Sequence, residues 1–269
     1  MMRDLIQFFR EIMANLPVIR RIAHFNVRTK WVDNYLGSSW DYIEPLLYIG
    51  TYYLVFGMGF YNGTVAGQPY LLWMLAAIVP WYYIQGVFNR GLTTVKSQLP
   101  QLSKTRFPLS IAVVMPLQEE MRRFLVMTGM FILVMFCYGR TPTIYWFQWF
   151  YAVFAMVMML VAFNLINSTL TILIPDFKPS MSAIFRLLFY SSGVIVNFDS
   201  KSMPYLIKAI LELSPFNYVL TMFRNSFLYD RWFFENANTT IFFWVLIFVL
   251  LVVGAYMHIH FRDEFTDLT

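Results

Sequence analysis

Six long apolar runs divide the chain. A bilayer-spanning helix needs about 20 mostly apolar residues, and each run comes close to that length. The runs cover residues 43–60, 70–89, 109–138, 144–174, 181–198 and 240–260. Six spans place both ends of the chain on the same side of the membrane. The pattern therefore predicts an all-α integral membrane fold with six transmembrane helices between residues 43 and 260.

The first 42 residues follow a different pattern. Apolar residues recur at steps of three and four from Leu5 to Leu16, while Gln7, Arg10 and Glu11 take the opposite side. This is the period of an amphipathic helix, and Pro17 either breaks it or opens a second helix. Such a helix lies along the inner membrane surface. Residues 1–42 are therefore predicted to be an interface segment, which either only anchors the chain or also contacts a partner.

Two connecting segments also show organisation. In KSQLPQLSKTRFP, residues 96–108, Pro100 and Pro108 bracket a basic stretch that can hold about two turns of helix; the alternative is a plain loop. In residues 199–239, a short helix from Met203 to Leu213 is predicted to stop at Ser214-Pro215, and a second amphipathic stretch follows. Neither is long enough to cross, so the pattern indicates an outer re-entrant helical pair with protein-buried or water-facing ends.

Composition and charge agree with this class and orient the chain. Hydrophobic residues make up 59% and charged residues 13% of the 269 residues, and the mean hydropathy is +0.56, whereas a soluble domain has about 25% charged residues. The loop 61–69 has no basic residue. The first 42 residues carry six: Arg3, Arg10, Arg20, Arg21, Arg28 and Lys30. Because cytoplasmic ends collect positive charge, both termini are predicted to be cytoplasmic, with residues 261–269 as a short tail.

Several kinds of chemistry are missing from the sequence. It has no Gly-x-x-x-x-Gly-Lys-Ser/Thr phosphate loop, so energy from ATP would have to come from a partner. His258 and His260 are two residues apart and point to different helix faces, which disfavours a metal site. The single cysteine, Cys137, excludes an intramolecular disulfide. A membrane-embedded transferase for lipid-linked sugars is disfavoured, because no carboxylate or histidine cluster gathers at a membrane surface. The net charge of +5 gives no reason to expect nucleic-acid binding.

One predicted span contains four charges, in LQEEMRRF, residues 117–124. If the helix begins near Pro108, these charges lie near the middle of the hydrocarbon core. In one interpretation the cluster is structural and pairs with itself, Glu119 with Arg122 or Arg123 and Glu120 with Arg123. In the other, part of the cluster faces a wet cavity, where Arg122 or Arg123 binds phosphates of a substrate in bidentate fashion.

The order of several stretches resembles a known family. They are YLGSSWDYIEPLLYIGTYYLVFG (35–57), AAIVPWYYIQGVF (76–88), KTRFPLSIAVVMP (104–116), PTIYWFQ (142–148) and SPFNYVLTMFRNSFL (214–228). Together with the basic amphipathic start, they resemble the membrane subunit of ATP-binding-cassette exporters of the type-2 class. Within that class they are most similar to wall teichoic acid translocation permeases. The resemblance covers nearly the whole chain.

The resemblance implies a homodimer in the plasma membrane that pairs with two copies of a cytosolic ATPase, which binds the ATP and Mg. The complex would export a lipid-linked anionic glycopolymer; the alternatives are another lipid-linked polysaccharide, a drug or a lipid. The coupling helix that docks on the ATPase would be Gln101, Leu102, Ser103, Lys104, Thr105, Arg106 and Phe107. Two positions depart from the family pattern: Pro175-Asp176 replaces an Arg-Asp pair, and Ser191, Ser192 and Gly193 replace a proline that interrupts the fifth span.

The first and fifth spans are expected to form the walls of the passage. Aromatic rings with a polar tip suit a sugar chain, because they can stack on sugar faces and hydrogen-bond hydroxyl groups, although most aromatic residues are expected to form interfacial belts or helix packing. The candidates for the substrate path are Tyr48, Tyr52, Tyr82, Glu119, Arg122, Arg123, Ser191 and Ser192. The candidates for the outer gate are Ser214, Pro215, Phe216 and Asn217.

Overall fold

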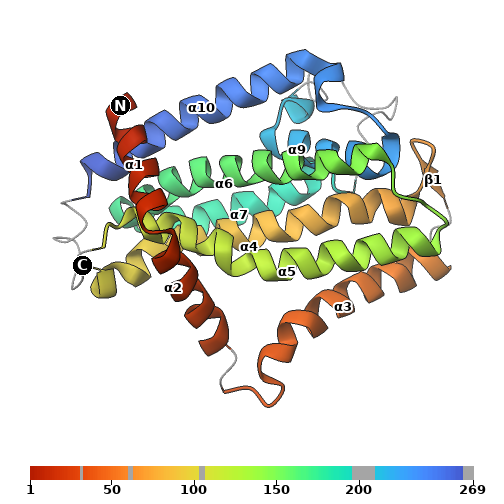
Figure 1. The fold of residues 1–269 in the computed structure, drawn as a ribbon, viewed down its shortest axis with the longest axis horizontal. Coiled ribbons are helices and arrows are strands. Elements are labelled where there is room, and N and C mark those ends of the chain that lie inside the picture. Colours follow the sequence, from red (N-terminus) through yellow and green to blue (C-terminus); the bar gives the residue numbers. More distant parts are fainter. Residues whose placement is uncertain (31–32, 60–62, 103–106, 196–209, 263–269) are drawn as a thin grey trace.

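The computed structural model describes residues 1–30, 33–59, 63–102, 107–195 and 210–262. Its long helices lie side by side along one axis (Figure 1). They are α4 (Tyr70–Leu102), α5 (Ser110–Cys137), α6 (Gln148–Leu173), α7 (Phe177–Ser191) and α10 (Ala237–His260). The first half of α4 is central, since each residue from Leu71 to Val79 is at most 3% exposed. A helix that is apolar on all sides is buried on all sides, and α4 packs against α5, α6, α7 and α9.

The predicted amphipathic start consists of two helices, α1 (Met2–Ala14) and α2 (Leu16–Thr29). Pro17 lies in the first turn of α2, where its missing N–H removes no helical hydrogen bond. The prediction that it opens a second helix is confirmed. Phe8 of α1 is fully buried against α10, and Ile19 of α2 packs on the start of α5. Helix α1 crosses obliquely near the end where α10 finishes, and α2 packs on α5 and then runs away from the bundle toward α3 (Figure 1).

The α-helix observed at the predicted first span, 43–60, is shorter than expected. After a 3₁₀ turn at Gly37–Ser39, α3 runs from Trp40 to Tyr52 and continues as a π-helix over Tyr53–Gly59. A hairpin follows at the far end of the bundle, with β1 (Thr64–Val65) and β2 (Gln68–Pro69) antiparallel. Ala66 and Gly67 both have positive φ, at 49° and 76°, which is the geometry of a type I′ turn.

The second part of the predicted outer pair is a buried helix. Helix α9 (Pro215–Arg224) begins at the predicted stop, packs between α4 and α6, and continues as a π-helix over Asn225–Tyr229. Asp230 ends it in the left-handed conformation, at φ 49°. Short 3₁₀ turns precede α6 and α10, at Ile144–Phe147 and Phe233–Asn236. Most of the first predicted helix, 203–209, lies outside the described residues.

Two predicted boundaries are wrong. Helix α4 does not stop at Pro100 but continues to Leu102, so the coupling segment does not begin as a separate helix there; Ser103 to Arg106 lie outside the described residues. The helix observed at the predicted fifth span, 181–198, begins before residue 181 and is shorter than the predicted span. Helix α7 starts at Phe177 and ends at Ser191, because Gly193 adopts φ 79° just beyond the last turn. The chain therefore turns where the family's proline would have interrupted the helix.

Three helical stretches within the described residues are long and apolar enough to cross a membrane: Tyr70–Leu99, Ile144–Leu173 and Phe233–His260. Helix α5 has 28 residues, but the four charges of LQEEMRRF interrupt its apolar sequence, so it is not among these three. At about 1.5 Å per residue, the 15 residues of α7 cover about 22 Å, less than the hydrocarbon core of about 30 Å. Over the described residues, the structure is an all-α membrane architecture apart from one hairpin with strands of two residues each.

Candidate functional site

The two carboxylates of LQEEMRRF bind an arginine of the neighbouring helix. Arg90 of α4 reaches both of them: its Nη1 lies 2.6 Å from Glu119 Oε2, and its Nε lies 2.7 Å from Glu120 Oε1. Each carboxylate side chain is 7% exposed. Gly86 makes room for this pair, because a Cβ there would stand 2.9 Å from the Glu120 carboxylate.

The two arginines of the same stretch turn to α3. Arg123 Nη2 lies 3.2 Å from Glu44 Oε1, and Arg122 Nη1 lies 3.5 Å from Asp41 Oδ2. Arg122 also donates to the Tyr42 hydroxyl. The predicted self-pairing of the stretch is therefore wrong, since its ion pairs within the described residues all lead to other helices. Local spacing allows contacts within α5, but three neighbouring helices offer closer partners.

We call these seven ionised residues the charge cluster: Asp41, Glu44, Arg90, Glu119, Glu120, Arg122 and Arg123. It contains three arginines and four carboxylates, so its formal charge is −1. A fourth helix joins it through Asn26 of α2, whose Nδ2 donates to Glu119 Oε1 at 2.7 Å. The cluster therefore connects α2, α3, α4 and α5 in one network, in keeping with the rule that charges inside a membrane protein are paired.

Three of the predicted path tyrosines lie together beside this cluster, and we call them the tyrosine row. The rings of Tyr48 and Tyr82 stack with centroids 4.8 Å apart, and the hydroxyl groups of Tyr52 and Tyr82 lie 3.1 Å apart. The Arg123 guanidinium lies 5.6 Å and 6.0 Å from the ring centroids of Tyr48 and Tyr82. All three tyrosines are partly exposed. Tyr48 and Tyr82 offer an aromatic face near a cation, and Tyr52 adds a phenolic hydroxyl beside that of Tyr82.

The structure therefore adds residues that the sequence analysis missed: Asn26, Asp41, Tyr42, Glu44 and Arg90. One signal for α3 was available, because Glu44, Tyr48 and Tyr52 follow one another at steps of four and share a helix face. A lone arginine at position 90, just after an apolar run, was a second signal. Neither signal identifies which residue of another helix these side chains contact.

Other predicted site residues lie elsewhere. The hydroxyl groups of Ser191 and Ser192 donate to the carbonyls of Leu188 and Phe189 in their own helix, and no described contact joins them to the tyrosine row. Phe216, predicted for the outer gate, is 5% exposed and stacks on Phe163, so it belongs to the core.

The other predicted gate residues differ in their surroundings. Ser214 is the N-cap residue of α9, Pro215 is the first residue of that helix, and Asn217 lines a cavity. Of the predicted coupling residues, Gln101 and Leu102 end α4, while Phe107 is 40% exposed.

A second polar contact fastens the N-terminal helix. Glu11 of α1 accepts a hydrogen bond from Ser110 at the start of α5, at 2.6 Å, and a bidentate one from Arg262 after α10, at 3.1 and 3.3 Å. Burial alone would raise the pKa of the Glu11 carboxyl, but hydrogen bonds from Ser110, Gln7 and Arg262 outweigh it, so the pKa lies below its ordinary value. The charged form of Glu11 therefore joins three separate segments.

The geometry of these residues favours binding and positioning a ligand over making or breaking its covalent bonds. No group of three or more metal-ligand side chains occurs among the described residues. The tyrosine row presents ring faces and phenols that match sugar faces and hydroxyl groups. The guanidinium groups of Arg122 and Arg123 already contact carboxylates, so a passing phosphate would have to compete with Asp41 and Glu44.

Comparison with known proteins agrees with this architecture. Residues 18–228 match the family described as ABC-2 type transporter. Two curated relatives from Klebsiella pneumoniae, both named O-antigen export system permease protein RfbA, are 22% and 21% identical over 249 residues. Each alignment covers 92% of this chain and 93% of the relative. Because the family match spans most of the chain, this protein belongs to the ABC-2 type transporter family and is a multi-pass membrane protein.

Proposed function

We propose that the chain is the permease subunit of an ATP-driven exporter that moves a lipid-linked polysaccharide across the plasma membrane. Both curated relatives carry the name of an O-antigen export permease and align over nearly their whole length. The chain has no phosphate loop of its own. A cytosolic ATP-binding-cassette subunit therefore supplies ATP binding and hydrolysis with Mg, and two such subunits act on a permease homodimer whose termini are cytoplasmic.

The tyrosine row beside the charge cluster is the observation that carries the proposal. Stacked phenols that stay partly exposed suit a sugar chain, because an aromatic face binds the apolar side of a sugar while the hydroxyl bonds its polar edge. Glu119, Arg122 and Arg123 position this surface. In this proposal α3 and α7 form the walls of the passage. The partly exposed Ser191 lines it at the end of α7, and Ser192, which is 1% exposed, supports the wall from the protein side.

The contacts of α2 suggest how ATP binding reaches the passage. When the ATPases close, they displace the coupling stretch and the interface helices α1 and α2. Asn26 of α2 is bonded to Glu119, and the neighbouring Arg122 and Arg123 hold α3 through Asp41 and Glu44. A shift of α2 is thereby passed to the helix that carries Tyr48 and Tyr52. The passage then opens between two copies of the chain, with Ser214, Pro215 and Asn217 at the outer gate and the buried Phe216 anchoring that segment in the core.

The finer proposal is that the cargo is wall teichoic acid, a lipid-linked anionic polymer. It rests on the resemblance of the quoted stretches and on arginines that contact the tyrosine row. A neutral or anionic O-antigen-type polysaccharide is the second candidate, which the names of the two relatives favour. Export of a drug or a lipid is a further alternative, without a specific observation in its favour.

Reconstitution with the cognate ATPase tests the proposal. Proteoliposomes are loaded with a polyprenyl-linked poly(ribitol phosphate) or with a neutral lipid-linked polysaccharide, and ATP-dependent protection from an external degrading enzyme is measured. Transport of the first alone supports teichoic acid, and transport of the second supports the O-antigen-type cargo. Transport of neither, by a complex that hydrolyses ATP, contradicts the proposal.

Variants connect the assay to the tyrosine row. Tyr48→Leu is expected to reduce transport about 2- to 10-fold with unchanged assembly, because one aromatic contact contributes about 0.5–1.5 kcal/mol. Tyr53→Leu is the matched control, since Tyr53 follows α3 directly, is 41% exposed and lies outside the row. Equal transport by both variants would remove the row from the path.

The ATPase contact has its own test. Lys104→Glu combined with Arg106→Glu reverses two charges of the coupling stretch, and the double variant is expected to weaken recovery of the ATPase in a pull-down or to uncouple hydrolysis from transport. Wild-type recovery together with wild-type coupling would exclude these two side chains from the interface.

A further inference from the structure

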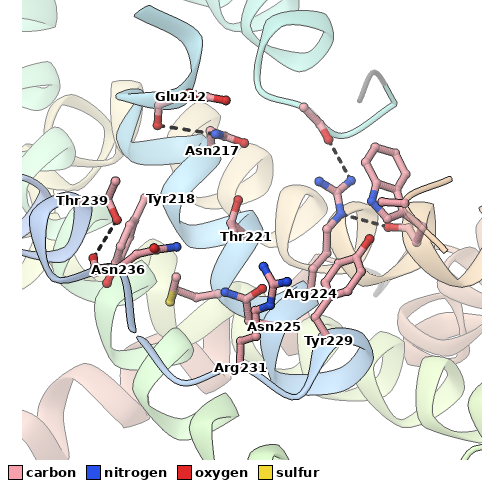
Figure 2. Close-up of a pocket in the computed structure, with 14 residues that line it drawn as sticks. Glu212, Asn217, Tyr218, Thr221, Arg224, Asn225, Tyr229, Arg231, Asn236 and Thr239 are labelled. Atoms are coloured by element: carbon pink, nitrogen blue, oxygen red, sulfur yellow. Dashed lines mark hydrogen bonds between the residues drawn. The ribbon is translucent and has the colours of Figure 1, made fainter. Parts of the chain in front are cut away.

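A polar cavity lies at the end of the bundle that carries the β1–β2 hairpin (Figure 2). Its volume is about 610 Å³, and its lining comes from the hairpin turn, α4, α9, α10 and the segments between them. It is separate from the tyrosine row and the charge cluster, since it shares no residue with either. A cavity of this size accommodates a ligand of several sugar or phosphate units.

A buried arginine forms one wall. Arg224, the last residue of α9, is 6% exposed, and its guanidinium lies 3.5 Å from the centre of the Trp73 ring. Its Nε donates to the Trp73 carbonyl at 3.1 Å, and its Nη2 donates to the carbonyls of Gly193 and Val194 at 2.8 and 3.1 Å. These bonds fix the side chain but bring it no counter-charge.

One nitrogen of Arg224 remains for a ligand. Guanidinium has five N–H donors, and the two on Nη1 make no hydrogen bond with any residue in the described ranges. No carboxylate of those ranges lies within ion-pair distance of Arg224. A buried cation bound only by carbonyls and a ring is costly unless an anion completes its surroundings.

A second arginine and neutral donors line the same cavity. Arg231 is exposed, and its side chain forms no ion pair or hydrogen bond with the part of the chain that the structure describes. Thr221, Asn217 and Asn225 add a hydroxyl and two amides. Among the described lining residues Glu212 is the carboxylate, so guanidinium groups outnumber carboxylates in that set. Two arginines with neutral N–H and O–H donors form a set that recognises a phosphate group.

We propose that this cavity is a binding site for a phosphate-bearing ligand, held by Arg224 and Arg231. Two sources of the same chemistry are available at a membrane surface: a phosphodiester of the exported polymer and the headgroup of an anionic phospholipid. Only the polymer source rests on the proposed function.

Protection of a single thiol tests the site. Thr239→Cys, at a lining position on α10, is made together with Cys137→Ser, which removes the native cysteine, and the permease is placed in nanodiscs of phosphatidylcholine alone. An anionic methanethiosulfonate reagent then labels the cavity, and soluble oligo(glycerol phosphate) is added as competitor. The oligomer is expected to slow labelling. Arg231→Gln is expected to raise the half-protecting concentration about 10- to 100-fold, the range for hydrogen bonds between charged groups.

Further variants control for folding and for general charge effects. Arg224→Gln is expected to act in the same direction, but it also loses three bonds to backbone carbonyls; if it does not assemble, Arg231→Gln decides alone. Arg140→Gln is the matched control, because it removes one positive charge at the same end of the bundle, where Arg140 contacts Gln68 outside the cavity. Protection of this variant should equal that of the parent.

The lipid composition separates the two sources. If the oligomer gives no protection but nanodiscs containing phosphatidylglycerol do, and Arg231→Gln relieves it, the site stands with a lipid headgroup as its ligand. If neither protects, or if Arg231→Gln leaves the protection unchanged, the proposal is overturned. The assay requires no ATPase and no transport, so a failure of the proposed export function would be seen separately.

Discussion

Replacing Arg90 by Gln is the sharpest test of the charge cluster. Among the described residues, Arg90 is the cation that contacts both Glu119 and Glu120, and each of these carboxylate side chains is 7% exposed. Removing one partner of a buried ion pair costs about 3–5 kcal/mol. Arg90 itself is 32% exposed, so water reaches part of the site. We therefore expect a loss near the lower limit, about 3 kcal/mol, which is on the order of a hundredfold in the ratio of folded to unfolded protein.

The assay compares detergent-purified variants by the fraction that stays monodisperse in size-exclusion chromatography after heating. Arg90→Gln should lose its monodisperse peak at a clearly lower temperature than the parent. Adding Glu119→Gln and Glu120→Gln should restore much of the loss, because the unpaired charges are then gone. Arg122→Gln is the comparison variant: its pair with Asp41 is 3.5 Å long and Arg122 is 42% exposed, so the loss should stay below about 1 kcal/mol.

Two outcomes would refute this reasoning. If Arg90→Gln is as heat-resistant as the parent, the pairs with Glu119 and Glu120 contribute little. If the triple variant is no better than Arg90→Gln alone, the damage comes from lost packing of the arginine side chain and not from unpaired carboxylates.

Two further predictions concern helix contacts. Gly91→Ala should sharply lower the yield of folded protein, because its Cβ would stand 2.1 Å from Oδ1 of the fully buried Asn164. The control Gly129→Ala should be nearly neutral, because a Cβ at position 129 has no atom within 4 Å. A normal yield of Gly91→Ala would mean that α4 and α6 can separate. As pH falls below about 4.3, the ordinary pKa of a glutamate, protonation of Glu11 should begin to loosen its contact with Arg262. The pKa of Glu11 in the folded protein lies below the unfolded value, so its stabilising effect is lost on acidification. The protease sensitivity of α1 should therefore rise with acid in the parent and depend less on pH in Glu11→Gln.

Apolar run length predicted the long helices well. The expected third, fourth and sixth spans, 109–138, 144–174 and 240–260, correspond closely to α5, to α6 with its preceding 3₁₀ turn, and to α10. In each case a mostly apolar stretch is bounded by polar or turn-forming residues, so the local pattern contains the boundaries even for 109–138, which the charges of LQEEMRRF interrupt. This part of the fold needs no knowledge of tertiary contacts.

The charge cluster could be located from the sequence but its pairing could not. Spacing along one helix identifies partners three or four residues away, yet Glu119 binds Arg90, 29 positions earlier, and Asn26, 93 positions earlier. Which partners are used depends on how α2, α3 and α4 surround α5. The same holds for Arg224, because its partners are backbone carbonyls, which every residue has and which residue identity therefore cannot predict.

The end of α4 shows a second limit. A proline inside a helix removes one hydrogen bond and crowds the preceding turn, so Pro100 predicted a boundary. In the structure α4 tolerates the loss of this bond and ends only two residues after Pro100, at Leu102. A rule for helix interiors therefore misplaced a boundary near a helix end.

The length of α4 gives the molecule a lever. From Trp73 to Leu102 the helix covers about 44 Å at about 1.5 Å per residue, well beyond the hydrocarbon core of about 30 Å. If it moves as one rod, a tilt of about 5° about one end displaces the other by about 4 Å. Trp73 supplies both the ring and a carbonyl that hold Arg224. If the rod pivots away from its Trp73 end, a displacement of Leu102 therefore also moves Trp73 and changes the shape of the distant cavity, without a relay of small rearrangements between them.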